Sequence, residues 1–352
     1  MKEFRITGQT EGQRLNKVLQ KLLPGAGTSF LYKMLRKKNI TVNDRKADGA
    51  QVLKSGDVIR IWFSDETYLK FAAPAGNPSP SWAGDKNHEH ADASDKSFRK
   101  PDILYEDDDL LFVNKPAGVL IQPDARTSAC LISDVREYLR KSSQAGEDGI
   151  FRVGPANRLD RNTSGIAAFG KTIRGQQYLA EQFRERDMKK YYLALVKGRF
   201  ARKSENEQIL SGWYVKNHRT NKALVYRDQA PDGAAPVAIG VLPVTGNERE
   251  TLLRVHLLTG KSHQIRVQLS EARHPIAGDP KYGDTNWNRE LEKTYRLRRQ
   301  FLHAWRLELK NLSGSDIIVT APLPDDLTRL LKGEKLWEPG IPEDSEGPLS
   351  KS

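Results

Sequence analysis

The 352-residue chain contains a single cysteine, Cys130. One thiol cannot form an internal disulfide or build a cysteine-rich zinc site. The longest apolar runs fall far short of the roughly 18 residues that a membrane-spanning helix needs, and the first residues lack the apolar stretch of a secretory signal. We therefore expect a cytoplasmic protein with a reduced thiol and no membrane partner.

Acidic residues are also in short supply, because 45 Asp and Glu face 57 Lys and Arg and leave a net charge of +12. A cationic surplus favours a polyanionic partner, since Lys and Arg displace counterions from phosphates. The surplus is uneven: residues 1–63 hold thirteen Lys or Arg against five Asp or Glu. The N-terminal segment is therefore the strongest candidate for binding nucleic acid.

Residues 1–63 have the pattern of a small α/β module. Leu and Val recur at helical spacing over residues 15–23, until Pro and Gly end the run. Thr28 or Ser29 is expected to cap a second helix, and short strands are expected at residues 40–42 and 58–63. The polar side of the second helix carries four cations, Lys33, Arg36, Lys37 and Lys38. Such a run is either a solvated face or an RNA-binding face, and its coincidence with the charge surplus favours RNA.

The order of these features resembles the small RNA-binding domain first seen in ribosomal protein S-four. The resemblance covers roughly residues 11–63. Its matching residues are Gly12-Gln13-Arg14-Leu15, Leu35-Arg36-Lys37-Lys38-Asn39-Ile40, Val42-Asn43-Asp44 and Ser55-Gly56-Asp57-Val58-Ile59. It implies that Arg14 and the four helix cations contact RNA.

Two segments have the composition of unstructured chain. Residues 64–100 are rich in Pro, Gly, Ser, Ala and Asp, which bury too little apolar surface to offset their ordering entropy. We expect a flexible linker there, and a loose tail at residues 333–352. His88 and His90 lie in the linker without a rigid frame, so we assign no metal to them.

Residues 101–332 are expected to form the larger domain. Strands are indicated at 110–113, 192–196, 252–257 and 315–321, and helices at 131–140 and 175–184. Strands that lie close in sequence with few helices between them favour an α+β fold. We expect a mixed, mostly antiparallel central sheet with a flanking active-site cleft.

The densest cluster of polar residues and glycine runs from Asn157 to Gly165, between two extended segments. One interpretation is a tight turn in which Asp160 bonds nearby backbone and Gly165 supplies an unusual dihedral angle. The other is a nucleophilic carboxylate, because neighbouring guanidinium groups favour the ionised form of an aspartate. The spacing alone leaves both interpretations open.

A second cluster runs from Leu258 to Gln268 and places His263, Arg266 and Gln268 in an otherwise apolar stretch that we interpret as a strand. An arginine leaving such a strand needs a carboxylate partner if it is buried. His274 and His303 lack metal-ligand spacing to His263. We therefore interpret His263 as a hydrogen-bonded structural histidine.

Two smaller signals carry cations. Lys115 follows the strand at 110–113 in a predicted turn, and Lys190 precedes Tyr191 and Tyr192 at the start of another strand. The tyrosines are either core residues or rings that stack on an unpaired base beside a cation.

Taken together, these clusters resemble the RluA-type pseudouridine synthases, in the branch that carries an S-four-like domain. The match runs from about residue 103 to 325, and the signature "H-R-L-D-R-x-T-S-G" appears as Asn157 to Gly165. Supporting segments are Asn114-Lys115-Pro116-Ala117-Gly118, Lys190-Tyr191-Tyr192-Leu193-Ala194, Thr259 to Arg266, Pro275 to Gly283 and Leu302-His303-Ala304.

The resemblance implies that Asp160 is the catalytic residue of an RNA-uridine isomerase that needs no metal or organic cofactor. Asp160 would attack the anomeric sugar carbon or C6 of the ring, or would assist cleavage through a glycal-like intermediate. Tyr192 would pack against the target ring, Arg266 would pair with Asp160, and Arg158 would fill the space that the flipped nucleotide leaves. Lys115 and Lys190 join the RNA-binding candidates.

Three residues depart from the family pattern and bear on which RNA is recognised: Asn157 replaces His, Lys261 replaces Arg, and Gln268 replaces a frequent His. The branch favours large-subunit ribosomal RNA over transfer RNA, with a monomer as the expected state. A catalytically silent RNA-binding or ribosome-assembly protein is the alternative. A nucleoside hydrolase usually requires two carboxylates, and the sequence offers one credible acid.

Overall fold

The computed structural model describes residues 1–7, 11–72, 99–123, 130–142, 153–185, 187–201, 206–217 and 222–337. His88, His90, most of the expected linker and the end of the expected tail lie outside these residues. The chain divides into two compact units. The first comprises Met1–Lys100, Asp134–Gly154 and Gly170–Gln176, and the second comprises Pro101–Ser133, Pro155–Phe169 and Gln177–Ser352.

The N-terminal module of the first unit is a four-stranded antiparallel sheet with helices, as expected. Its strands follow the order β1-β4-β2-β3. The elements are β1 (Lys2–Arg5), α1 (Leu15–Leu22), α2 (Thr28–Arg36), β2 (Ile40–Val42), β3 (Arg45–Lys46), β4 (Val58–Ile61) and α3 (Asp65–Ala72). The aliphatic residues that predicted the helices are buried together with Ile40, Ile59 and Ile61 of the sheet. Gly27 occupies the N-cap of α2 and no side chain caps it, so the prediction of a Thr28 or Ser29 cap was wrong.

The module extends beyond residue 63. Helix α3 packs Tyr68 and Phe71 against the module core, and the rings of Phe30 and Phe71 lie 4.5 Å apart. The expectation of a linker from residue 64 was therefore wrong for residues 65–72. The polar composition of residues 64–100 as a whole concealed this short helix. Tyr68 and Phe71 anchor it to the module core.

The second unit is built around an eleven-stranded sheet. Its order is β11-β10-β12-β13-β9-β14-β8-β6-β5, with β15 beside β14 and β7 beside β8. The strands are β5 (Asp102–Glu106), β6 (Leu110–Lys115), β7 (Gly154–Pro155), β8 (Ser164–Gly170), β9 (Lys189–Lys197), β10 (Gln208–Asn217), β11 (Lys222–Tyr226), β12 (Ala235–Gly246), β13 (Glu250–Leu257), β14 (Leu302–Lys310) and β15 (Asp316–Thr320). β14 pairs with β8 in parallel and with β9 antiparallel, as β9 does with β13, and this confirms a mixed, mostly antiparallel sheet.

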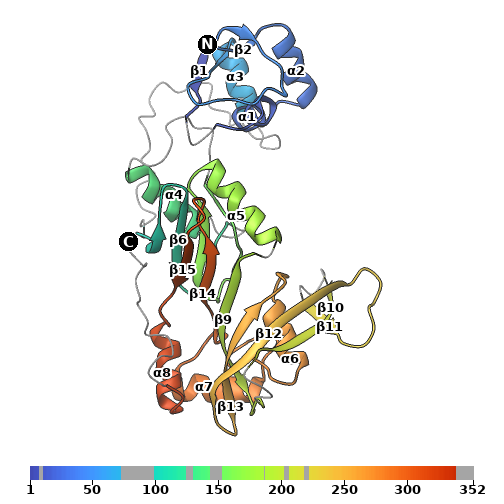
Figure 1. The fold of residues 1–352 in the computed structure, drawn as a ribbon, viewed down its shortest axis with the longest axis vertical. Helices are drawn as coiled ribbons and strands as arrows, with labels where there is room; N and C mark the ends of the chain where they lie inside the picture. Colours follow the sequence, from blue (N-terminus) through green and yellow to red (C-terminus); the bar gives the residue numbers. More distant parts are fainter. Residues whose placement is uncertain are drawn as a thin grey trace, which may run out of the picture. The chain divides into compact units, whose positions relative to one another are not determined.

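The remaining helices are α4 (Leu131–Lys141), α5 (Ile173–Glu185), α6 (Gln264–Glu271), α7 (Thr285–Tyr295) and α8 (Asp325–Gly333). Figure 1 shows α6 beside β10 to β12, and α7 and α8 together near β13. Apolar residues of α6, α7 and α8 form one core with β9 and β13. None of the described helices is both long and apolar enough to cross a membrane.

Two boundaries differ from the sequence-based expectations. Gln264–Glu271 is a helix rather than part of a strand. Arg266 and Gln268, two of the polar residues in that stretch, are buried, and Gln264 Nε2 donates to Gln268 Oε1 at 2.9 Å one helical turn away. The second unit also continues past residue 333, because Leu336 is buried and Trp337 packs against the core, so the expected tail was wrong for residues 333–337.

Candidate active site

The loop that carries Asp160 connects β7 to β8, and β8 lies between β14 and β6 in the sheet. Gly165 has a φ of +106°, and a Cβ there would lie 2.1 Å from the carbonyl oxygen of Ala304. A glycine is therefore required where β8 meets β14 in parallel. The backbone N–H of Thr163 donates to the carbonyl of Asp160 at 3.0 Å and closes a tight turn around the acid. The predicted tight turn is therefore present, and it holds a carboxylate that is partly open to solvent. The role of Asp160 as a nucleophile stays a prediction.

Lys115 supports the backbone around this loop. Its side chain is fully buried, and Nζ donates to the carbonyls of Pro116, Val119 and Arg161, each at 2.9 Å. Burial lowers the pKa of Lys115 to about 7, with a smaller contribution from Arg299 and an opposing one from Asp160. The expectation that Lys115 contacts RNA was therefore wrong, because three backbone acceptors hold its ammonium group inside the protein.

Arg299 holds the other side of the loop. Its guanidinium bonds both carboxylate oxygens of Asp326, at 2.6 and 2.8 Å, and donates to the carbonyl of Asn162 and to Ser164 Oγ, each at 3.3 Å. Ser164 Oγ lies 2.9 Å from Nδ1 of the buried His303, whose Nε2 faces the carbonyl of Ala321 at 3.1 Å. Burial lowers the pKa of His303 to about 4, so this ring is neutral and Nε2 carries its proton.

Arg266 of α6 lies between two carboxylates. Nε and Nη2 donate to Asp279 at 2.7 Å each, and Nη1 donates to Asp160 Oδ2 at 2.8 Å. Burial by itself would lower the pKa of Arg266, but Asp279 and Asp160 outweigh it and raise the pKa. Burial likewise opposes ionisation of Asp279, yet Arg266 and the N–H groups of residues 281 and 282 lower its pKa. Asp279 therefore fixes the guanidinium, which in turn orients Asp160.

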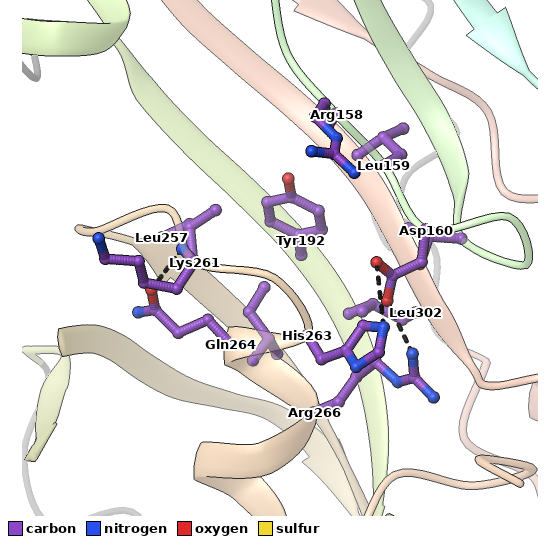
Figure 2. Close-up of a pocket in the computed structure, with 12 residues that line it drawn as sticks. Arg158, Leu159, Asp160, Tyr192, Leu257, Lys261, His263, Gln264, Arg266 and Leu302 are labelled. Carbon is purple, nitrogen blue, oxygen red and sulfur yellow. Dashed lines mark hydrogen bonds and ion pairs between the residues drawn. The ribbon is translucent and has the colours of Figure 1, made fainter. Parts of the chain in front are cut away.

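These residues border a cleft of about 370 Å³ that opens to solvent (Figure 2). Its apolar walls are Leu159, Leu257, Ile265, Leu302 and the ring of Tyr192. Its polar lining consists of Arg158, Asp160, Thr163, Lys261, His263, Gln264 and Arg266. An apolar slot with a few convergent polar groups and one carboxylate suits a planar, uncharged ring such as a nucleobase.

Tyr192 presents its ring to this cleft from β9, between Val255 and Ala304 of the neighbouring strands. Burial, with a smaller contribution from Asp160, raises the pKa of its hydroxyl, so the tyrosine is neutral. The structure thus brings together Asp160, Arg158, Tyr192 and Arg266, the four residues of the predicted centre.

The remaining RNA-binding candidates divide into two groups. Lys190 is buried, and its Nζ lies 5.4 Å from the centre of the Phe183 ring, so its prediction as an RNA contact was wrong. The five candidates of the N-terminal module are exposed, and they stay predictions. These are Arg14, Lys33, Arg36, Lys37 and Lys38.

Sequence reasoning missed two participants of the site. Asp279 lies in the Pro275–Gly283 segment, which was noted but given no role, and a lone acid among apolar and glycine residues was the available signal. His263 was interpreted as a hydrogen-bonded structural histidine, and its Nδ1 does lie 3.1 Å from the hydroxyl of Tyr282, but its Nε2 also lies 3.9 Å from Asp160 Oδ1. Its position three residues before Arg266 was the signal that could have placed it in the cleft.

Two of the three departures from the family pattern have structural partners. Asn157 donates to the carbonyl of Ile166 at 3.1 Å and accepts from the N–H of Ala168 at 2.9 Å. Gln268 donates to the carbonyl of Leu210 at 2.9 Å. Lys261 instead lines the cleft with an exposed side chain, and is the departure best placed to meet a substrate.

Comparisons with known proteins show the family to which the chain belongs. Residues 109–271 match the family model described as RNA pseudouridylate synthase. The chain is 32% identical to ribosomal large subunit pseudouridine synthase D of Nitrosomonas europaea, over 94% of this chain and 87% of that protein. It is 31% identical to ribosomal large subunit pseudouridine synthase C of Escherichia coli strain K12, over 94% and 96%.

Solved structures share the fold. The structure of human RNA pseudouridylate synthase domain containing 4 superposes with a TM-score of 0.53 and 21% identity, over 66% of this chain and 92% of that one. From the matches in sequence, the chain belongs to the RluA-type RNA pseudouridylate synthases, a family of isomerases that convert uridine to pseudouridine in RNA.

Proposed function

We propose that this protein isomerises uridines in large-subunit ribosomal RNA, with Asp160 as its catalytic carboxylate. The relatives named above are ribosomal large subunit pseudouridine synthases, and they match almost the whole chain. The observation that carries the assignment of Asp160 is the guanidinium of Arg266, which Asp279 fixes and which bonds one oxygen of Asp160 at 2.8 Å. Among the described residues that line the cleft, Asp160 is the one carboxylate.

The reaction begins when the target uridine leaves its stack and enters the cleft. Extrusion costs a few kcal/mol, and stacking on an aromatic ring returns about 1–3 kcal/mol. In the proposal the uracil ring lies against Tyr192, and Arg158 helps to hold the opened RNA. Leu257 and Leu302 exclude water from the faces of the ring.

The chemistry then separates the base from the sugar and joins them again. Asp160, kept in place by Arg266, attacks the anomeric carbon or C6 of the ring, or assists cleavage through a glycal-like intermediate. The N1–C1′ bond breaks, the base rotates, and C5 forms the new bond to C1′. The steps use groups of this chain and water, and none is routed through a metal or organic cofactor. A cytoplasmic monomer remains our prediction.

The test is the variant Asp160→Asn, which keeps the shape of the side chain but removes the negative charge. We expect no detectable tritium release from RNA labelled at C5 of uridine, with RNA affinity and melting temperature close to those of the wild type. Equal tritium release by the variant would rule out Asp160 as the catalytic residue. RNA binding by a wild-type protein that releases no tritium would instead identify a silent RNA-binding protein.

The target is tested separately. Mapping pseudouridines on total cellular RNA with and without this gene should show sites that disappear from large-subunit ribosomal RNA. A loss confined to transfer RNA would leave the isomerase assignment intact and overturn the proposed substrate.

A further inference from the structure

His263 has an unusual backbone for its residue type. It stands at the N-cap of α6 with φ 57° and ψ 16°, in the left-handed region. Residues other than glycine rarely adopt this region, and strained backbone concentrates at functional sites. The conformation directs the imidazole into the cleft rather than along the helix, beside Asp160 (Figure 2).

Tyr282 fixes the ring of His263. Its hydroxyl oxygen lies 3.1 Å from His263 Nδ1 and accepts the backbone N–H of Ala223 at 2.9 Å. With Nδ1 engaged, Nε2 is the ring nitrogen that faces Asp160, at 3.9 Å from Oδ1. That separation is too long for a hydrogen bond. It leaves Nε2 beside the acid and open to a substrate.

The isomerisation needs a group of this kind. Once C5 of the base has bonded to C1′, C5 still carries its original hydrogen, and that hydrogen must leave as a proton. The described cleft-lining residues offer few acceptors. Guanidinium and ammonium groups are donors without an acceptor site, which removes Arg158, Arg266 and Lys261. Tyr192 is a neutral phenol, and Asp160 is engaged in breaking and remaking the bond to the sugar.

We propose that His263 is a second catalytic residue, the base that removes the proton from C5. The inference rests on the proposed function and deepens it. The step uses the tautomer in which Nδ1–H donates to the Tyr282 hydroxyl oxygen, so that Nε2 has a free lone pair. This lone pair takes the C5 proton and the C5–H electron pair restores the C5=C6 double bond. The electron pair of the N1=C6 bond returns to N1, which takes up a proton from water. The imidazolium gives its proton to solvent, so one proton leaves and one arrives, and the sum is an isomerisation.

The surroundings suit a base that is neutral before this step and stabilised afterwards. Burial lowers the pKa of His263, and the cations of Arg266 and Lys281 add to that effect, while Asp160 and Asp279 oppose it. The ring therefore enters the reaction unprotonated. The imidazolium that forms then lies within 3.9 Å of the Asp160 carboxylate.

The deciding experiment uses His263→Asn, because asparagine tolerates the left-handed backbone and has no basic nitrogen. Rates are measured on RNA with hydrogen or deuterium at C5 of the target uridine. Removing a positioned base costs about 10²-fold or more in kcat. We expect that loss of kcat. We also expect a kinetic isotope effect, the ratio of hydrogen to deuterium rates, larger than that of the wild type. A purely structural histidine would lower kcat without raising the isotope ratio, and an unchanged ratio overturns the proposal.

A second variant guards against misfolding. His263→Gly accepts the backbone without strain and leaves space for a small base, so added imidazole should restore its tritium release in proportion to concentration. Failure of imidazole to raise the rate of a folded His263→Gly protein would count against the proposal.

The matched control is His274→Asn, since His274 lies outside the cleft on the carbonyl of Lys197. It should keep the wild-type rate and isotope ratio. If the wild type is active and Asp160→Asn is not, but His263→Asn leaves the isotope ratio unchanged, only the assignment of His263 is wrong. An inactive wild type would sink the proposed function as well.

Discussion

The N-terminal module and the second unit use positive charge in opposite ways. In the module, the described buried polar side chains are Gln13 and Thr41, both uncharged, and the candidate RNA-binding cations are exposed. The second unit buries Lys115, Arg266 and Arg299 and gives each one fixed acceptors. The same residue types are therefore exposed in one region, where we propose that they attract RNA, and held in fixed geometry in the other.

The difference follows from the surroundings of each charge. Exposed charges act through water, at distances where salt screens them. A buried charge is costly unless its partners are well placed, so its position is fixed to within the geometry of its hydrogen bonds. A phosphate backbone tolerates variable contacts, whereas a nucleophile has to meet one carbon atom. Substitutions that keep the charge should thus affect the second unit far more than the module.

The largest effect is expected for Arg266→Lys, which keeps the charge but cannot bridge Asp160 and Asp279 at once. Small misplacement of a catalytic group costs about 10²-fold in rate, so we expect kcat to fall by that factor or more. Tritium release at saturating RNA measures it. The matched control is Arg36→Lys, an exposed arginine of the module that should tolerate the same change. Similar losses of kcat in both variants would show that the two regions do not differ in their tolerance of an Arg to Lys change.

An intermediate effect is expected for the triple change Arg36→Gln, Lys37→Gln and Lys38→Gln. Each lost phosphate contact should reduce the slope of log affinity against log salt by about 0.7–0.9, so binding weakens most at low salt while kcat at saturation is unchanged. Titrations of RNA at several salt concentrations measure the slope.

The control for the triple variant removes the same charge from the second unit, through Arg289→Gln, Lys293→Gln and Arg298→Gln. An equal change of slope in the control would mean that net charge matters and these residues do not contact RNA. They lie at the end of α2 rather than on one helix face as predicted, because the helix ends at Arg36 and Lys37 is its C-cap. A deletion that removes the module should end after residue 72, because α3 belongs to its core.

The smallest effect is expected for a buried acid of the second unit that, unlike the buried cations, lacks a fixed partner for one of its polar atoms. Glu250 is 1% exposed, its Oε1 has no hydrogen-bond partner, and burial and Glu334 raise its pKa to about 8. A raised pKa adds stability below the unfolded value of about 4.3, and that contribution is lost as pH rises through about 8.

Glu250→Gln removes this titration and can donate to Glu334. Removing a free-energy cost of about 1 kcal/mol for the buried charge should raise the melting temperature by about 2–4 °C at pH 9, with little change at pH 5. Thermal melts at both values measure it, and the exposed Glu290→Gln should show no such pH dependence. A variant that is less stable than the wild type at pH 9 would show that the charged form of Glu250 is well accommodated.

Patterns local in sequence were the ones that could be predicted. The helices at residues 131–140 and 175–184 and the strand at 110–113 follow from apolar periodicity, and the structure has them. The Asp160 loop was found because its polar residues and glycine are contiguous. Its partnership with Arg266, 106 positions away, came from resemblance, since no spacing rule links the two.

Features that depend on distant partners were missed. Lys115 looked like a surface cation because the sequence cannot show that three carbonyls, one of them Arg161, surround its ammonium. The 264–271 helix was interpreted as a strand because its polar residues lie in an otherwise apolar stretch. The sequence cannot show that its glutamines are buried through bonds to each other and to β10. The polar composition of residues 64–100 concealed helix α3, although Tyr68 and Phe71 pack it against the module core. In each case the tertiary neighbours decided the outcome.

The two-carboxylate grip on Arg266 has a consequence for the enzyme's cycle. In the proposed reaction, an Asp160 that bonds to the nucleoside loses its negative charge and regains it on release. Asp279 keeps two hydrogen bonds to the guanidinium throughout, so the arginine need not relocate when its other partner turns neutral. Groups that are already oriented require no rearrangement during reaction. The pocket can thus begin each new round with its charges in the arrangement of the round before.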